Sequence, residues 1–452
     1  MGSMDRSSGD RGLAVEDTAL IARSCALEDV SFGAILDGTA GSRIQWATPD
    51  GLEIVGCGVA ARLEASGSDR FERIRTAATQ TFAAVDYDGP AVARPRAFGG
   101  LAFHDEHDPT PPWDGFDAAS FVVPRVLVVR ADTGIWLTVV EETRNEATET
   151  LDAWRTRLST LPTMRSSGTN PGVTSTSRTT TREEWTAGVE TALERIRYDE
   201  LEKVVLAQTL VATLEEPVDV PATLERLRRQ YPNCYRFLVE PNGSGTFFGA
   251  PPERLVRKDG KRIRTEALAG SVPRGETPEE DDSLAEWMVD SEKFQREHGL
   301  VVTAIKSQLE AVTRELTIGE QTIRRLATIQ HLQTPIDGTL ETECHVLDIV
   351  EALHPTPAVG GLPPGLAWET IRRVEPFERG WYAAPVGWFD GDGNGEFAVG
   401  IRSGVATDDA VTLFAGNGIV ADSDPTEEWE EVQLKFRPIL PRRMLPEYPD
   451  GS

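Results

Sequence analysis

The pattern of apolar and polar positions divides the chain into two halves. The first half contains strand-like runs rich in Val and Ile, with turn residues between them, at Phe121–Val129 and Gly134–Val140. In the second half the patterns alternate, with helices predicted over Glu183–Tyr198 and Val220–Tyr231 and a strand over Lys203–Val211. Strands interrupted by helices in this way predict an α+β fold, in which helices cover sheets.

One helical pattern is much longer than the others. It runs from Leu284 to Leu316, and its apolar side contains residues at helical spacing: Leu300, Val301, Ile305, Leu309 and Val312. Glu297 and His298 fall at the border of this apolar side. Glu297 is either part of a solvated helix face or a carboxylate ligand for a cation such as Mg²⁺.

A polar segment separates the two halves. Residues Arg165–Arg182, with the sequence RSSGTNPGVTSTSRTTTR, are rich in Ser, Thr and Gly and almost without apolar side chains. This composition predicts a flexible link over residues 165–182. We therefore expect residues 1–164 to form the N-terminal part of a β-rich core and residues 183–445 to form a second region.

The acidic run Asp390–Gly395, DGDGNG, resembles the start of a calcium-binding loop. Its twelfth position is Ile401, where such a loop needs a bidentate glutamate. The run lies between two strand-like segments, Pro385–Phe389 and Glu396–Ile401. It is therefore predicted to be a hairpin turn.

The composition is strongly acidic. The chain has 452 residues, with 73 Asp and Glu against 46 Lys and Arg, and a formal net charge of −27. Six of the basic residues are lysines and the other 40 are arginines. Such a surface repels nucleic acid and anionic membranes, which excludes both as partners. Adaptation to high salt, where the Debye length falls to roughly 3 Å, is one hypothesis for the charge; an ordinary acidic protein is the other.

Four cysteines, Cys25, Cys57, Cys234 and Cys344, are scattered without a CxxC pair. They are expected to be thiols in a reducing compartment. No apolar run approaches the roughly 18 residues that a membrane span needs, and the start MGSMDRSS lacks the apolar region of a signal peptide. These features predict a soluble, cytoplasmic protein.

The segment Phe414–Lys435, FAGNGIVADSDPTEEWEEVQLK, is the richest in candidate chemical groups. A glycine-bracketed turn is predicted to lead into a short helix, on which Glu428, Glu431 and Lys435 share one face. Two carboxylates and an ammonium near a glycine turn suit a cation and an anionic ligand together. An exposed acidic helix with an incidental salt bridge is the alternative, and this segment alone does not decide between them.

Two more polar residues lie in apolar surroundings. Lys203 opens the run KVVL and is either an edge lysine that protects a sheet or a partly buried general base. Glu253 follows two prolines in FFGAPPERL. A carboxyl held against apolar surface can have a raised pKa and act as a general acid. A salt bridge from Glu253 to Arg254 or Arg257 is the alternative.

Further segments combine polar groups with glycine or proline. In Thr265–Ser271, TEALAGS, small residues allow backbone N–H groups to approach an anion, unless the segment is a plain turn. Leu353–Gly361, LHPTPAVGG, is predicted to be a rigid loop. The runs QHLQTPIDG and RGWYAAPVGW supply His331 and Tyr382, and Arg402 ends a predicted strand.

Together and in this order, these segments resemble the chorismate-utilising enzymes, which include isochorismate synthases, salicylate synthases and the large subunits of anthranilate and aminodeoxychorismate synthases. The resemblance covers about residues 183–440. It is strongest to isochorismate synthases, through HPTPAVGG, EPFERGWYAAPVGW and DGNGEFAVGIR. It implies a large, helix-covered antiparallel β-sheet core, with residues 183–445 as the chorismate-binding catalytic region.

The resemblance also implies a role for each motif residue. Lys203 is implied to activate a water molecule as a base, and Glu253 to protonate the departing hydroxyl. Glu297 and Glu431 are implied to bind Mg²⁺, with Glu428 behind them. The substrate is implied to be held by a set of residues and backbone groups: Gly270, Ser271, His331, Ala358, Tyr382, Arg402, Gly416 and Lys435.

The implied activity is that of an isomerase, a monomeric Mg²⁺-dependent isochorismate synthase serving menaquinone synthesis. In its reversible reaction, water adds at C2 of chorismate as the C4 hydroxyl leaves. The alternatives are a salicylate synthase, which also eliminates pyruvate, and a catalytically silent chorismate-binding subunit. Amine-adding relatives have a loop resembling HPAGT where this chain has HPTPA, and the salicylate branch typically has threonine where Ala358 or Val359 stands. Both comparisons favour isochorismate as the product.

Five positions depart from residues that are common in the family: Gln208, Pro251, Phe294, Ala384 and Asn417. None of them removes a group with an implied catalytic role. Asn417 and Ala384 are expected to alter the carboxylate pocket, so the departures bear on substrate affinity more than on the type of reaction.

Overall fold

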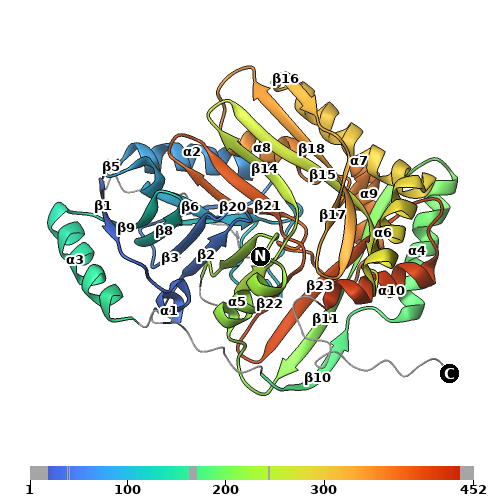
Figure 1. Cartoon of the computed structure of the whole chain (residues 1–452), viewed down its shortest axis with the longest axis horizontal. Coiled ribbons are helices and arrows are strands. Elements are labelled where there is room, and N and C mark those ends of the chain that lie inside the picture. Colours follow the sequence, from blue (N-terminus) through green and yellow to red (C-terminus); the bar gives the residue numbers. More distant parts are fainter. Residues whose placement is uncertain (1–18, 38, 40, 162–170, 243–244, 438–452) are drawn as a thin grey trace, which may run out of the picture.

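Two large sheets with helices packed against them form the core of the molecule (Figure 1). The computed structural model describes residues 19–37, 39, 41–161, 171–242 and 245–437. Apart from one parallel pair, the paired strands among these residues are antiparallel. The predicted α+β fold with a helix-covered antiparallel core is therefore confirmed.

The first sheet joins strands from both ends of the chain. Its order among the described residues is β10 (Val173–Arg178), β11 (Lys203–Leu214), β23 (Ala410–Ile419), β22 (Ser403–Ala406), β13 (Thr246–Gly249), β12 (Arg236–Val239), β2 (Arg43–Ala47), β3 (Glu53–Cys57), β8 (Val126–Ala131), β9 (Gly134–Glu141), β1 (Leu20–Leu27) and β5 (Val85–Asp88), with β19 (Gly361–Leu362) paired to β11. Strands β1 and β5 are parallel. Because β12 pairs with β2, the N-terminal strands continue the sheet that the C-terminal strands begin.

The second sheet also contains both halves of the chain. Its order among the described residues is β16 (Thr313–Ile318), β18 (Ile329–Leu340), β15 (Arg262–Pro273), β14 (Arg254–Asp259), β21 (Gly395–Val399), β20 (Pro385–Asp390), β6 (Arg96–Leu101), β7 (Ala119–Val123) and β4 (Ala61–Ala65), with β17 (Thr322–Arg325) paired to β18. Strands β20 and β21 form an antiparallel hairpin, which confirms the predicted turn at Asp390–Gly395.

The helices of the described residues are α1 (Phe32–Asp37), α2 (Arg70–Ala83), α3 (Arg144–Thr160), α4 (Arg182–Arg197), α5 (Val220–Gln230), α6 (Pro278–Asp290), α7 (Glu292–Glu310), α8 (Val346–Leu353), α9 (Pro364–Val374) and α10 (Pro425–Phe436). In Figure 1, α4, α6, α7, α9 and α10 lie on the side of the molecule opposite α3. The start of α10 has a clear local cause. The Asp424 carboxylate accepts hydrogen bonds from the N–H groups of Thr426 and Glu427, and Pro425 occupies the first turn.

The single helix expected from Leu284 to Leu316 is wrong. Helix α6 ends at Asp290 and α7 begins at Glu292, because Ser291 between them has an extended backbone with φ −75° and ψ 120°. The last residues of the expected helix belong to β16, which pairs with β18. The expected helix is therefore the end of α6, the whole of α7 and part of β16.

The glycine turn expected near Gly416 is also wrong, because Gly416 and Gly418 lie within β23. A Cβ atom added at Gly416 would lie 2.7 Å from the carbonyl oxygen of Leu206 on the neighbouring strand β11. The glycine is therefore required by close strand contact and not by a turn.

The polar segment between the halves is only partly a link. Residues Val173–Arg178 form β10 and pair with β11, so the expected flexible link is wrong for them, and α4 begins at Arg182. Residues 165–170 lie outside the described part of the chain. The predicted division into residues 1–164 and 183–445 stays a proposal about two regions of one core.

The single strand-like run Phe121–Val129 is two strands, β7 and β8, which belong to different sheets. Pro124 stands between them, where no backbone N–H is available for a sheet. The four cysteines are unpaired, as expected. Among the described helices, none has the length and apolar character to cross a membrane.

A buried ion pair joins β11 to the loop before β19. The Arg379 guanidinium binds the Glu375 carboxylate at 2.5 Å, and both side chains are 2% exposed. Arg379 also donates to the carbonyl oxygens of Val205 (2.7 Å) and Val359 (2.9 Å), and Glu375 accepts from the N–H of Ala207 (2.8 Å). The pair therefore fixes two backbone segments relative to each other.

Replacing Arg379 with glutamine tests the strength of this pair. The change leaves the Glu375 carboxylate buried without its cation, so we expect the free energy of unfolding to fall by about 3–5 kcal/mol in urea denaturation. Arg372→Gln is the matched control, because Arg372 pairs with Glu106 at the surface, where the expected loss is below about 1 kcal/mol. Equal losses in the two variants would contradict the role given to burial.

Candidate active site

A cavity of about 120 Å³ brings the predicted site residues together. It is lined from β11 and β23 of the first sheet, from β15 and β18 of the second, and from helices α7 and α10. Every residue predicted for the site lines it: Lys203, Glu253, Gly270, Ser271, Glu297, His331, Ala358, Tyr382, Arg402, Gly416, Glu431 and Lys435. Segments that are far apart in the sequence therefore line one cavity.

Lys203 is a buried lysine inside the first sheet. It begins β11, which is paired with β23 on one side and with β10 and β19 on the other, so the edge-lysine interpretation is wrong. The residue is 1% exposed, and its Nζ donates a hydrogen bond of 2.8 Å to Oε1 of Glu297 on α7. Gly418 on β23 leaves room for the Lys203 side chain, because a Cβ atom at Gly418 would lie 2.6 Å from Cε of Lys203.

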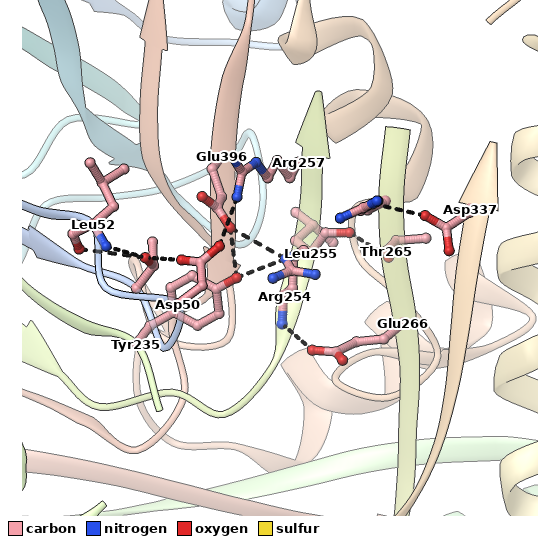
Figure 2. Close-up of polar contacts among 12 residues, drawn as sticks. Asp50, Leu52, Tyr235, Arg254, Leu255, Arg257, Thr265, Glu266, Asp337 and Glu396 are labelled. Atoms are coloured by element: carbon pink, nitrogen blue, oxygen red, sulfur yellow. Dashed lines mark hydrogen bonds and ion pairs between the residues drawn. The ribbon is translucent and has the colours of Figure 1, made fainter. Parts of the chain in front are cut away.

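Glu253 is a buried carboxyl in the connection between β13 and β14. The salt bridges considered for it form elsewhere: Arg254 pairs with Glu396, and Arg257 pairs with Asp50 (Figure 2). Burial raises the pKa of Glu253 to about 8, the negative charge of Glu266 adds to the effect, and the Lys203 ammonium opposes it. Glu253 is therefore largely protonated at neutral pH, as a general acid must be.

A β-bulge presents the backbone of β15 to the cavity. The register of β15 against β18 shifts between Ala269 and Ser271, and Gly270 has φ +74°, a conformation that suits glycine. The carbonyl oxygen of Gly270 lies 3.1 Å from Nδ1 of His331, and Oγ of Ser271 lies 3.0 Å from the same atom. The TEALAGS segment is thus a bulged strand and not a plain turn.

Arg402 and His331 form a buried pair of donors and acceptors. Arg402 Nη2 donates to Nε2 of His331 at 3.2 Å, and since a guanidinium only donates, Nδ1 carries the proton of the imidazole. Burial, and then the cations Arg402 and Lys435, hold the pKa of His331 well below its usual range, so the ring is neutral. Within the described residues, Nη1 of Arg402 is buried without a hydrogen-bond partner, which leaves a donor for an anionic ligand.

Aromatic and small side chains shape another part of the cavity. The Tyr382 ring stacks on Phe414, with ring centres 5.2 Å apart and an interplanar angle of 18°. Burial raises the pKa of Tyr382, so its phenol is neutral and can donate a hydrogen bond. Ala358 lines the cavity from the loop between α8 and β19 and offers no polar group.

Helix α10 turns its acidic face toward the cavity. Lys435 Nζ donates to the carbonyl oxygen of Gly416 (3.0 Å), to Oε1 of Glu431 (3.0 Å) and to Oδ1 of Asn417. Asn417 Nδ2 in turn donates to Oε2 of Glu428 at 3.0 Å. Glu428 is 4% exposed, so the interpretation of an exposed acidic helix is wrong.

Three carboxylates, Glu297, Glu428 and Glu431, supply oxygen atoms that suit a hard divalent cation. Burial raises the pKa of Glu428, and the neighbouring charge of Glu431 raises it further, a repulsion that a cation would relieve. Burial also acts to raise the pKa of Glu297, but the charge and hydrogen bond of Lys203, together with the charges of Lys435 and Lys293, lower it, so Glu297 is ionised. Among the described residues no three His, Cys, Asp or Glu side chains form a complete metal site. The residues fit a cation that takes its other ligands from water and substrate.

Lys293 and Phe414 line the cavity but were not predicted. Lys293 precedes Glu297 by four residues on α7, and its Nζ lies 3.7 Å from Oε1 of Glu428, so helical spacing from Glu297 could have found it. Phe414 precedes Gly416 by two residues, which places both on the same face of a strand. With Lys203 and Lys435, three of the six lysines of the chain line this cavity.

The fold and the cavity define an α+β protein with a cavity that is lined by a buried lysine, a protonated carboxyl and further cationic groups. A family model described as "Chorismate binding enzyme" matches residues 16–442. The chain therefore belongs to the chorismate-binding enzyme family.

Relatives and solved structures agree with this assignment. The chain is 34% identical over 416 residues to the isochorismate synthase MenF of Bacillus subtilis, covering 88% of this chain and 87% of the relative. It is 35% identical over 445 residues to the salicylate biosynthesis isochorismate synthase of Pseudomonas aeruginosa, covering 96% and 92%. The structure of MenF, the menaquinone-specific isochorismate synthase from Escherichia coli, superposes with a TM-score of 0.78 at 29% identity and covers 94% of each chain.

Asn417→Ala tests the amide that links Glu428 to Lys435. The change removes donors from a buried carboxylate, so we expect the free energy of unfolding in urea to fall by about 1–3 kcal/mol. Gln433→Ala is the matched control, because this amide, which lies on the same helix as Glu428 and Lys435, contacts neutral groups only; its expected loss is below about 1 kcal/mol. A loss in Asn417→Ala no larger than in the control would show that the link adds nothing.

Proposed function

We propose that this protein is an isochorismate synthase, an isomerase that interconverts chorismate and isochorismate. The observation that carries the proposal is the placement of Lys203 and of the protonated Glu253 on the same cavity. Water addition at C2 with loss of the C4 hydroxyl needs a base for the water and an acid for the leaving group. The names of the relatives support the same reaction.

The proton transfers balance without another reactant. Lys203 first gives its ammonium proton to solvent, and the free amine then takes a proton from the attacking water as the new C2–O bond forms. The ring double bonds shift, the C4–O bond breaks, and Glu253 gives its proton to the departing hydroxyl, which leaves as water. In the reverse direction the two residues exchange roles, which makes the reaction reversible.

The cationic groups of the cavity are proposed to hold the two carboxylates of chorismate. Arg402 has a free Nη1 donor, Lys435 lies at the backbone of Gly416, and Tyr382 offers a neutral phenol. These groups matter because a chain with a net charge of −27 repels a dianion at long range. Local donors in a closed site outweigh that repulsion, since charged hydrogen bonds strengthen when water is excluded.

We propose Mg²⁺ as the cofactor, with Glu297 and Glu431 as its protein ligands and Glu428 behind them. The repulsion between Glu428 and Glu431 and the oxygen-only donor set support this choice. When bound, the ion offsets the charge of a substrate carboxylate. Lys203 and Glu297 are hydrogen-bonded in the structure. The proposed base would then lie next to a proposed metal ligand.

Isochorismate is proposed as the released product. Ala358 stands in the loop where a threonine is typical of the pyruvate-eliminating branch, and its methyl group supplies no hydroxyl to the cavity. For the pathway we propose menaquinone synthesis, supported by the likeness to the menaquinone-specific structure. Supply of isochorismate for salicylate is the competing destination, since one relative carries that description.

The setting of the enzyme is also a proposal. The four unpaired cysteines support a reducing compartment such as the cytoplasm. A monomer is proposed from the resemblance to isochorismate synthases alone. The net charge of −27 supports the hypothesis of adaptation to salt.

The product assay is the direct test of the proposed function. Protein incubated with chorismate and Mg²⁺ should form isochorismate, identified by chromatography, and a chelator should stop the reaction until Mg²⁺ is restored. Pyruvate, followed by coupling to lactate dehydrogenase, should not accumulate. Salicylate with pyruvate would assign the enzyme to the other branch, and unchanged chorismate would leave a silent binding subunit.

Lys203→Met and Glu253→Gln test the base and the acid. Each should lower kcat by about 10²–10⁴-fold, while chorismate binding measured by calorimetry is retained. The wild type should lose activity as the pH rises through about 8, because Glu253 then gives up the proton that it must donate. Lys306→Met, an exposed lysine of α7, is the matched control and should leave kcat unchanged. Full turnover by Lys203→Met would overturn the base assignment.

A further inference from the structure

The backbone of Glu253 is held on both sides by neighbouring strands. The N–H of Arg254, which belongs to the peptide group after Glu253, donates to Oε1 of Glu266 at 3.0 Å (Figure 2). The carbonyl oxygen of the same peptide group accepts from the N–H of Val399 at 3.2 Å. Glu266 is on β15 and Val399 is on β21, so two strands fix the position of the candidate acid.

Glu266 is a buried carboxylate surrounded by donors. It is 7% exposed, its Oε1 also lies 3.0 Å from Nη1 of Arg324 on β17, and its Oε2 accepts from the side-chain amide of Gln333 on β18. Arg324 is fixed in turn by a hydrogen bond of 2.8 Å to the carbonyl oxygen of Asn233. Contacts with donors alone satisfy the ionised form of a carboxylate, so Glu266 carries its charge in this place.

Glu266 does not line the cavity, and it has no part in the roles assigned above. We propose that Glu266 is the positioning residue of the acid: its carboxylate fixes the Glu253–Arg254 peptide group, and its negative charge adds to burial in favouring the protonated form of Glu253. This inference rests on the proposed function, in which Glu253 donates the proton to the leaving hydroxyl.

The charges around Glu253 explain why such a residue is needed. Lys203 on β11 and Arg324 on β17 are cations that favour the ionised form of Glu253. Lys293, Arg402 and Lys435 are further cations that line the cavity, His331 is neutral, and Glu297 is paired with Lys203. Burial is the largest cause of the raised pKa of Glu253, and Glu266 is the nearby negative charge that adds to it. Without Glu266, the cations would act on Glu253 unopposed by a like charge.

Two substitutions that remove charges of opposite sign test the proposal through the pH dependence of kcat. Glu266→Gln keeps an oxygen for the N–H of Arg254 but removes the charge, so the pH at which activity falls should move down by about one unit. Arg324→Gln removes the opposing cation and should move it up. The double variant should return close to the wild-type profile, because both charges are then absent.

The control and the contrary results are equally specific. Asp337→Asn removes an exposed carboxylate that pairs with Arg264 across the same two strands, β15 and β18, and it should leave the profile unchanged. An unchanged profile in Glu266→Gln would overturn the proposal, and so would shifts in the same direction in both single variants. Thermal unfolding of each variant shows whether it is folded. A structural defect would lower kcat at every pH without changing the pH at which activity falls.

The same question can be answered without turnover. In protein labelled with carbon-13 at the glutamate carboxyl groups, the Glu253 resonance is identified by its absence from Glu253→Gln. Its titration midpoint should fall in Glu266→Gln and rise in Arg324→Gln. If the wild type formed no isochorismate, the proposed function would fail while this measurement still tested the influence of Glu266. Equal midpoints in the wild type and both variants would overturn the inference alone.

Discussion

The ion pair between Lys203 and Glu297 is the contact on which the site depends. It joins β11 of the first sheet to α7, which packs on β15 of the second sheet, across a separation of 94 residues in the sequence. Taking two charges out of water costs several kcal/mol per ion, so the pair persists only with close geometry. That geometry requires a glycine at position 418, where any side chain would meet both partners. The site therefore lies where the first sheet and the helix that packs on the second sheet meet.

The choice of lysine at the site follows from the same physics. The chain uses arginine for most of its cations, yet three of its six lysines line the cavity. A guanidinium remains charged at any pH relevant to proteins, so it can hold an anion but cannot accept a proton. An ammonium can lose its proton, and its compact head fits beside a carboxylate. In the proposed mechanism, Arg402 therefore holds an anion and Lys203 exchanges a proton.

Local patterns predicted the parts of the fold that depend on near neighbours in the sequence. The periodicity of α4 and α5 and the β20–β21 hairpin were predicted correctly, because caps, spacing and turn residues determine them. The strand around Gly416 and the polar strand β10 were missed, since β10 depends on pairing with β11 and β23 on pairing with β11 and β22. The same limit applied to the site. Residue types indicated an acid, a base and two carboxylates, but burial and contacts decided against the edge lysine, the exposed helix and the salt bridges of Glu253.

Two glutamates of one cavity show how neighbours, and not residue type, assign chemical roles. Glu253 and Glu297 are both buried, and burial acts to raise the pKa of each. Glu297 meets the Lys203 ammonium at 2.8 Å, which lowers its pKa and keeps it ionised. Glu253 follows two prolines and faces the charge of Glu266, so its pKa rises to about 8. Environments that move the pKa values of two carboxyls apart in this way suit one to the proposed role of acid and the other to the proposed role of metal ligand. The separation arises because Lys203 donates a hydrogen bond to Glu297, with Lys435 and Lys293 adding their charge, while the Glu266 carboxylate acts on Glu253.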